Sequence, residues 1–159
     1  MTGLAELSGR LGNMNSDPLT HEIIGAAIEV HRNLGPGMLE SAYEECFCFE
    51  LIGRGLSVRR QVILPLVYKS VELNLGYRPD LVIDNQVIVE LKCVEKLLPV
   101  HEALVLTYLK LTGLERGLLI NFQSQPLVNG IKRLVRNWSP ASAVTAVSAS
   151  PSAKGNEKI

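Results

Sequence analysis

The chain has 159 residues, with 16 basic and 16 acidic side chains, so its formal net charge at neutral pH is zero. This length fits one domain and leaves no room for two of ordinary size. The balanced charge excludes a histone-like protein and a protein that binds polyanions through a basic tail. Apolar residues make up 47% of the chain and aromatic residues only 5%, which predicts a sizeable core of Leu, Val and Ile.

The two ends of the chain differ from its middle in composition. Residues 1–15 are Gly-rich and weakly patterned, which indicates a flexible lead. Residues 139–159 are rich in Ser, Ala and Pro, and such a segment cannot offset the entropy lost on ordering. We therefore predict one domain over residues 16–138, followed by a disordered tail.

The three cysteines are Cys46, Cys48 and Cys93, an odd number with no framework spacing, which argues against a secreted disulfide scaffold. A zinc site is the alternative, but no second Cys or His pair stands at the usual spacing, so buried thiols are favoured. No apolar run reaches the ~20 residues that span a bilayer. The first residues lack a basic segment followed by an apolar one, so no secretory signal is expected and the predicted location is cytoplasmic.

Two helices are predicted at the start of the domain. The first opens at residues 19–22 with Thr20 as its N-cap, carries an apolar stripe as far as Val30, and ends at Gly35-Pro36-Gly37. The second runs from about Met38 to Gly53. Its apolar residues recur at steps of three and four, and we expect this stripe to face the core: Leu39, Ala42, Tyr43, Cys46, Phe47 and Leu51.

The middle of the chain changes to the period of strands. Strands are predicted within 58–68, at 71–75, and at 77–83 and 86–94, the last two joined by a turn at Asp84-Asn85. A third helix begins at Pro99 and ends at Gly113, 117–122 is a buried strand, and 126–138 is a last helix. This order predicts an α/β (α+β) fold in which helices flank a mixed central β-sheet.

The residues most suggestive of chemistry are Asp80, Glu90 and Lys92. Glu90 and Lys92 are two apart on one strand, so they project from the same face. Charges in so apolar a strand are costly to bury without partners, and a divalent cation would remove that cost. Asp80, Glu90 and the Leu91 carbonyl would supply hard oxygen ligands, and Lys92 would hold a water or neutralise charge on a phosphate.

This constellation requires one register. If residues 84–86 form a three-residue loop, Ile83 faces Val87 and Asp80 faces Glu90, so the two carboxylates converge. A two-residue loop would place Asp80 opposite Val89 and separate the carboxylates. The structural alternative is an ordinary salt bridge between Lys92 and one of the two acids.

Several motifs carry a family resemblance. Pro79-Asp80 followed by Glu90-x-Lys92 resembles the PD-(D/E)XK nuclease-like superfamily, and Gly37 to Tyr43 matches the signature of the GxxExxY protein family. The resemblance covers about Leu19 to Arg136. Other segments that look like the same family are His31–Gly37, Val89–Lys92, Leu97–Ala103, Leu109–Gly113 and Gly117–Phe122.

The resemblance implies a restriction-endonuclease-like core. It makes Asp80 and Glu90 metal-binding acids, Lys92 the catalytic lysine, and Glu40 an additional acid directed at the metal. Glu40 and Tyr43 share a helical face, and we expect Glu40 to face the acidic pair. A solvated charge or a capping role is the alternative for Glu40.

Other positions are weaker candidates. Tyr43, Lys96 and Tyr108 are possible substrate contacts, although Tyr43 also suits a packing role with a polar group. Many exonuclease-like members carry Gln four residues before the tyrosine, whereas this chain has Leu104, which puts strong exonuclease activity in doubt. Helix capping or packing is favoured for His31 and His101. Basic residues occur at two places, as solvated faces or phosphate contacts: Arg59, Arg60, Lys132, Arg133 and Arg136.

The preferred hypothesis is a Mg²⁺-dependent nuclease, with Mn²⁺ as a substitute, that hydrolyses the phosphodiester bonds of nucleic acid and favours DNA. The first alternative is a catalytically weak or inactive nucleic-acid-binding or regulatory module with the same fold. The second is a structural or oligomerising domain in which the charged cluster is a satisfied network. The sequence leaves open the polymer, the choice of end or internal cleavage, the pathway and the oligomeric state.

Overall fold

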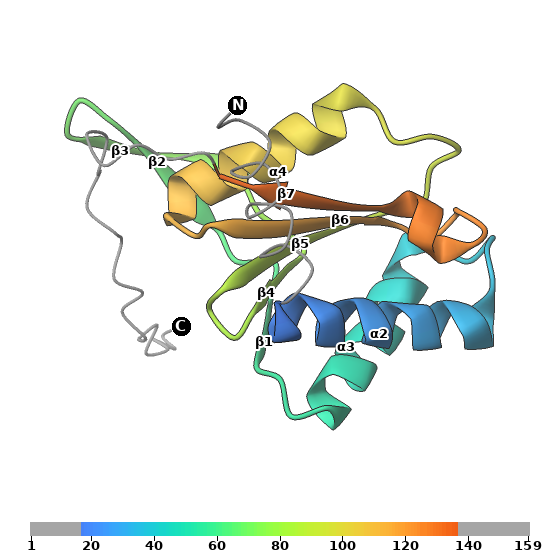
Figure 1. The fold of residues 1–159 in the computed structure, drawn as a ribbon. Helices are drawn as coiled ribbons and strands as arrows, with labels where there is room; N and C mark the ends of the chain where they lie inside the picture. Colours follow the sequence, from blue (N-terminus) through green and yellow to red (C-terminus); the bar gives the residue numbers. More distant parts are fainter. Residues whose placement is uncertain (1–16, 137–159) are drawn as a thin grey trace, which may run out of the picture.

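The computed structural model describes residues 17–136, shown in colour in Figure 1. The lead expected at 1–15 and the tail expected at 139–159 lie outside these described residues. Three helices, α2 (Pro18–Leu34), α3 (Glu40–Gly53) and α4 (Pro99–Thr112), pack around one main sheet. No helix between residues 17 and 136 combines the length and the apolar character needed to cross a bilayer.

The main sheet has five strands in the order β1-β4-β5-β6-β7. The strands are β1 (Val58–Arg60), β4 (Leu81–Ile83), β5 (Val87–Lys92), β6 (Arg116–Asn121) and β7 (Ile131–Val135). β5 and β6 pair in parallel, with α4 as the crossover between them, whereas every other pair in the sheet is antiparallel. The predicted mixed α/β architecture is therefore confirmed.

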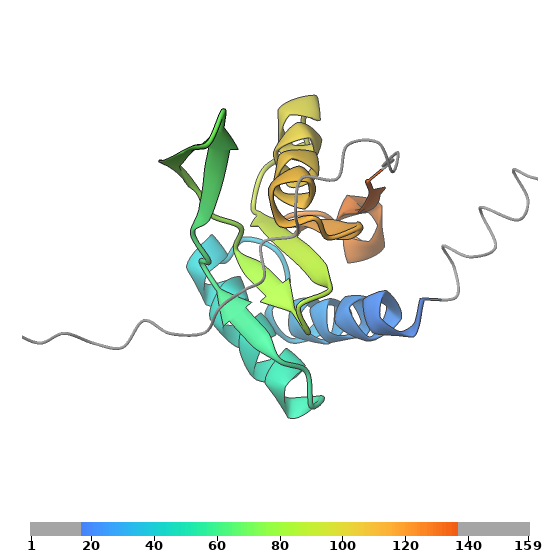
Figure 2. The same ribbon diagram turned by 90° about the vertical axis from the view of Figure 1, so that its left-hand side faces the viewer.

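The sheet separates two apolar clusters. Helices α2 and α3 cover one face and α4 covers the other, as Figure 2 shows. In β5, Val87, Val89 and Leu91 enter the cluster under α2 and α3, while Ile88 enters the cluster under α4. Because side chains alternate along a strand, Glu90 and Lys92 lie on the Ile88 face, at the end of β5.

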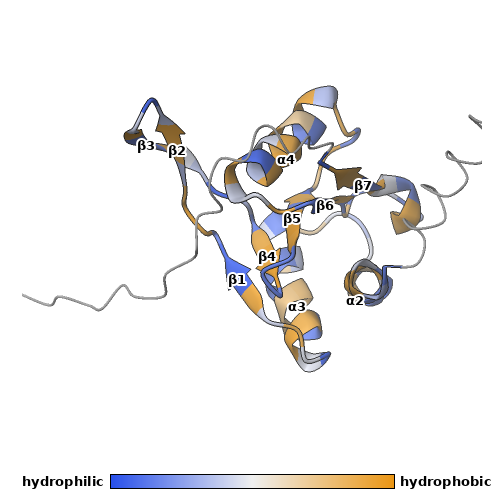
Figure 3. Cartoon of the chain, turned by 60° about the vertical axis from the view of Figure 1, so that its left-hand side comes forward, coloured by the Kyte–Doolittle hydropathy of each residue, from blue (hydrophilic) through white to orange (hydrophobic). Residues whose placement is uncertain are grey.

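Strands β2 (Leu64–Tyr68) and β3 (Val71–Tyr77) form a separate antiparallel hairpin that projects from the body of the molecule (Figure 1). Lys69 and Ser70 form its turn, and both have positive φ. Figure 3 colours parts of this hairpin as hydrophobic, and its exposed apolar residues include Val67, Val71 and Leu75. Together, β1 to β4 form one antiparallel arm that bends where β1 gives way to β2.

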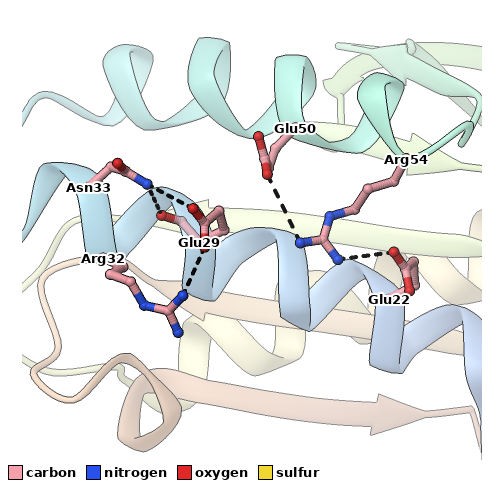
Figure 4. A network of polar contacts seen from close by, with 6 residues as sticks. All are labelled: Glu22, Glu29, Arg32, Asn33, Glu50 and Arg54. Atoms are coloured by element: carbon pink, nitrogen blue, oxygen red, sulfur yellow. Dashed lines mark hydrogen bonds and ion pairs between the residues drawn. The ribbon is translucent and has the colours of Figure 1, made fainter.

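Helices α2 and α3 are also joined by polar contacts at their outer surface (Figure 4). The Arg54 guanidinium lies 2.9 Å from Glu22 Oε1 on α2 and 4.0 Å from Glu50 Oε1 on its own helix. Glu29 accepts hydrogen bonds from Arg32 and Asn33 in the last turns of α2. Because these groups are partly exposed, the pairs contribute little to stability beyond the packing of the two helices.

Three predicted boundaries were wrong. The helix predicted at 126–138 is a short 3-10 turn, η1 (Leu127–Gly130), followed by β7, because the open edge of β6 offers a full ladder of hydrogen bonds. The strand predicted at 77–83 is divided, since Tyr77 ends β3 and β4 starts at Leu81. The N-cap of α2 is Asp17, whose side chain accepts a hydrogen bond from the Leu19 N–H, and not Thr20.

The predicted inward face of the second helix was also partly wrong. Leu39 is 77% exposed and Cys46 is exposed. The α3 residues that fill the core are Tyr43, Phe47, Cys48 and Leu51. The stripe is rotated toward Cys48 because the aromatic rings of α3 pack against Phe122 at the end of β6.

Candidate functional site

The site is built where β4 and β5 meet. Ile83 pairs with Val87 and Leu81 pairs with Val89, so residues 84–86 form the three-residue loop that the constellation requires. The next position beyond Leu81 in this register is Asp80, opposite Glu90. The Leu91 N–H donates a hydrogen bond of 2.8 Å to Asp80 Oδ2, which places the Asp80 carboxylate beside the end of β5.

Glu90 is the most unusual side chain of the site. It is 4% exposed, and its Oε2 is buried without a hydrogen-bond partner among the described residues. Its Oε1 lies 3.6 Å from Lys92 Nζ. Burial, a side-chain hydrogen bond with Asp80, and the charges of Asp80 and Glu40 raise the pKa of Glu90 to about 9, against the opposing effect of Lys92. Without a cation, Glu90 is therefore protonated at neutral pH.

The Asp80 carboxylate is held from two sides. Leu91 N bonds to Oδ2, and Gln61 Nε2 donates a hydrogen bond of 3.0 Å to Oδ1. The backbone N–H of Gln61 also donates to the carbonyl of Asp80, at 3.0 Å. Sequence reasoning missed Gln61, because a single uncharged residue between two predicted strands carries no pattern.

Glu40 stands at the first position of α3 and is exposed overall. Partial burial of its carboxylate and the charges of Asp80 and Glu44 raise its pKa, while Lys92 lowers it. The charges of Asp80 and Lys92 therefore both act on the Glu40 carboxylate. Within residues 17–136, however, no group of three or more His, Cys, Asp or Glu side chains is arranged to hold a metal ion. Glu40 therefore does not complete a three-carboxylate cluster with the acidic pair.

The oxygen atoms of Asp80 and Glu90 suit a hard cation. The unpartnered Glu90 Oε2 and the Asp80 carboxylate are oxygen ligands of the type that Mg²⁺ and Mn²⁺ prefer. Lys92 O accepts a hydrogen bond from Phe122 N on the β6 side, whereas Leu91 N points toward Asp80. Since the N–H and C=O of one strand residue point to the same edge, the Leu91 carbonyl is expected on the Asp80 side as well.

Comparison with known proteins gives a match over this whole region. The family model of the PD-(D/E)XK nuclease superfamily matches residues 17–134. The chain belongs to this superfamily. The mixed sheet and its three flanking helices agree with the restriction-endonuclease-like fold expected of a member. Searches of curated proteins and of solved structures give no match.

In this superfamily member, Tyr43 is part of the scaffold. It is fully buried and stacks on Phe122, with ring centroids 4.6 Å apart. Its hydroxyl donates to Gly35 O and accepts from Met38 N at 3.2 Å, so it holds the loop between α2 and α3. The expected substrate contact of Tyr43 is at odds with this burial. The loop it holds leads directly into Glu40.

Tyr108 is near enough to the acids for their charges to act on it, but its hydroxyl already has a hydrogen-bond partner. It is 5% exposed, and its hydroxyl donates to Arg78 O at 3.3 Å, two residues before Asp80. Burial, and then the charge of Glu90, raise the pKa of Tyr108 to about 12. Leu104, one turn earlier, is partly buried in the apolar cluster under α4. Tyr108 therefore supports the segment that carries Asp80.

The remaining candidates lie around the site or away from it. Lys96 is exposed in the segment after β5. That segment is held by Asn121, which is buried, accepts from Val94 N and donates to Val94 O. His101 accepts a hydrogen bond from Leu98 N and so caps α4, as expected. Lys132 on β7 contacts Glu102 on α4, so this basic residue is paired with an acid.

Proposed function

We propose that this chain is a metal-dependent nuclease that hydrolyses phosphodiester bonds of nucleic acid, with DNA as the favoured substrate and Mg²⁺ or Mn²⁺ as the cation. The observation that carries the proposal is Glu90, a buried carboxyl group with one unpartnered oxygen, placed between Asp80 and Lys92. An ordinary structural salt bridge would leave no such oxygen. Membership of the nuclease superfamily gives the class of reaction.

Each residue of the site has a separate role in the proposed reaction. Asp80, Glu90 and the Leu91 carbonyl would hold the cation, which when bound polarises a phosphate oxygen and makes a bound water more acidic. Because Glu90 is protonated without a cation, it must release its proton before it can act as a ligand. Lys92, which is 21% exposed, would direct the attacking water and offset the negative charge that develops on the phosphate.

The test measures metal binding and cleavage separately. The melting temperature of the parent, Asp80→Asn and Glu90→Gln is followed against Mg²⁺ and Mn²⁺, and the same proteins are incubated with single-stranded, duplex and structured DNA and RNA. We expect the cations to stabilise the parent, and we expect both variants to lose stabilisation and cleavage. A parent that neither binds the cations nor cleaves any of these substrates would contradict the proposal.

A second candidate is a nucleic-acid-binding or regulatory module that binds the cation without turnover. The observation that favours it is Leu104, which offers only apolar surface beside Tyr108. Two of the predicted phosphate contacts are also engaged by acids, since Arg60 pairs with Glu44 and Lys132 with Glu102. Metal-dependent stabilisation without cleavage of any substrate would select this candidate.

A further inference from the structure

Gln61 stands at the bend of the antiparallel arm. The last pair of β1 and β4 is Arg60 with Leu81, and the Gln61 N–H extends the ladder by bonding to the carbonyl of Asp80. At this residue φ is +51°, a left-handed conformation that is uncommon for a residue other than glycine. The chain turns there toward β2, and the Gln61 side chain is directed at the acids instead of continuing the strand pattern.

The side-chain amide of Gln61 joins two carboxylates. Its nitrogen lies 3.0 Å from Asp80 Oδ1 and 2.9 Å from Glu44 Oε1, so each of its two hydrogens has an acceptor. Glu44 lies one turn after Glu40 on α3, and Arg60 binds its other oxygen at 2.9 Å. The amide therefore lies between two like charges and links α3 to the end of β4.

We propose that Gln61 is a positioning residue that fixes the Asp80 carboxylate for the cation and ties it to α3 through Glu44. This inference rests on the proposed function in so far as Asp80 is a ligand. Leu91 N holds Oδ2 and Gln61 holds Oδ1, so the carboxylate has a single orientation. Without the amide, Asp80 would be held by the Leu91 N–H without the second hydrogen bond, and it would face the charge of Glu44. Groups that orient a metal ligand in this way typically contribute ~10–100-fold to metal affinity.

Three substitutions distinguish the contribution of the Gln61 side-chain amide from that of the backbone bend at this residue. Gln61→Leu removes both donors at similar size, and Gln61→Glu places an acceptor between two carboxylates. Gln61→Asn shortens the side chain by one methylene, and Asn adopts positive φ more readily than Gln, so the bend itself is preserved. The matched control is Gln86→Leu, because Gln86 accepts from Arg116 at 2.8 Å near the opposite end of β5.

The first measurement needs no metal. In the full chain without cations, hydrogen exchange of the Leu91 amide reports whether Asp80 stays in place, since that amide donates to Asp80 Oδ2. We expect exchange at least ~10-fold faster in Gln61→Leu and Gln61→Asn, and unchanged in Gln86→Leu. The Phe122 amide, which donates to Lys92 O on the other side of β5, should be unaffected in all of them.

The second measurement is Mn²⁺ affinity by calorimetry. We expect Mn²⁺ to bind ~10–100-fold more weakly to Gln61→Leu and Gln61→Asn, weaker still to Gln61→Glu, and normally to Gln86→Leu. Parental Leu91 exchange in Gln61→Leu and Gln61→Asn would overturn the proposal, and so would faster exchange with parental Mn²⁺ affinity. If the parent itself bound no Mn²⁺, the proposed function would fall. The exchange measurement would then still decide whether Gln61 holds Asp80.

Discussion

Two lysine–glutamate pairs in this molecule have the same chemistry and different surroundings. Lys132 and Glu102 meet at the surface, where their side chains are 47% and 32% exposed, and water can solvate both. Lys92 and Glu90 meet at the end of β5, where their side chains are 21% and 5% exposed. The second pair is held 3.6 Å apart and leaves one Glu90 oxygen without a partner. The two pairs therefore differ in burial and in whether both carboxylate oxygens have a partner or solvent.

The largest expected difference between the two pairs is in catalysis. Lys92→Ala should lower the rate of phosphodiester cleavage by ~10²-fold or more, because its proposed role arises as charge develops in the transition state. Lys132→Ala should leave the rate within about twofold. Mn²⁺ should still raise the melting temperature of Lys92→Ala, since Lys92 is not proposed as a ligand. Equal cleavage by the parent and Lys92→Ala, with contaminating nuclease excluded, would contradict this mechanism.

The pH dependence of the unfolding free energy should also distinguish the buried Glu90 from the surface Glu102. The pKa of Glu90 is about 9 in the folded protein, raised mainly by burial from its ordinary 4.5. Below pH 4.5 the group is protonated in both states, so its favourable contribution is fully present. As the pH rises toward 9, the unfolded chain ionises while the folded protein keeps the proton, and stability falls.

Unfolding of the metal-free protein by urea at several pH values measures this effect. We expect a loss of about 1.4 kcal/mol for each unit of pKa difference in the parent across that window. Glu90→Gln should lack this component of the pH dependence and should be the more stable protein at pH 8. Glu102→Gln, the control from the surface pair, should retain the parental profile. A parental pH profile in Glu90→Gln would exclude the raised pKa.

A buried polar group on the opposite face of the sheet gives a third test. Tyr43→Phe keeps the stacking on Phe122 but removes the hydroxyl that bonds to Gly35 and Met38. We expect a loss of ~1–3 kcal/mol of unfolding free energy, because the two backbone groups lose their partner. Tyr68→Phe, at an exposed position of the hairpin, should change stability by less than ~0.5 kcal/mol. Equal stabilities of the two variants would remove the structural role of the Tyr43 hydroxyl.

The surface pair itself should contribute little. In a double-mutant cycle on Lys132 and Glu102, we expect a coupling free energy of ~0–1 kcal/mol that decreases with added salt. Chemical denaturation at low and high ionic strength measures it. A coupling that is larger and independent of salt would place this pair in the same class as Lys92 and Glu90.

The smallest effect is expected for the end of the chain. Removal of residues 139–159 should change the unfolding free energy by less than ~1 kcal/mol, because a segment of this composition is not predicted to pack. Thermal unfolding of the truncated and full chains tests this. A large loss of stability would show that the Ala- and Val-rich segment contributes contacts.

Those parts of the site that depend on local pattern could be predicted from the sequence. The spacing of Glu90 and Lys92 fixes their common face. The sequence allowed a two-residue or a three-residue loop before Val87, and the structure has the three-residue loop at 84–86 that places Asp80 opposite Glu90. Gln61 could not be predicted, because its position depends on a left-handed residue at the bend of the arm.

The errors in the fold have similar causes. The helical spacing at 126–138 was overridden by the open edge of β6, which no local window can show. The stripe of α3 was misplaced because Cys46 and Cys48 are equally compatible with an apolar face, and only the packing of Phe122 decides between them. Tertiary contacts, and not propensity, therefore determine these elements.

The long arm from β1 to β4 also has a consequence for how the protein folds. Its two sides run from Val58 to Ile83 around the turn at Lys69 and Ser70, so its contacts are local in sequence and can close from that turn inward. The pairing of β6 with β5 depends on a longer loop closure, since a parallel pair needs a long connection, here the segment that contains α4. Asp80 and Gln61 face each other across this arm, a few pairs from the turn. One extra residue between Lys69 and Ser70 would thus act on the pairing of β2 with β3, whereas the alignment of Asp80 with Glu90 depends on the loop at 84–86.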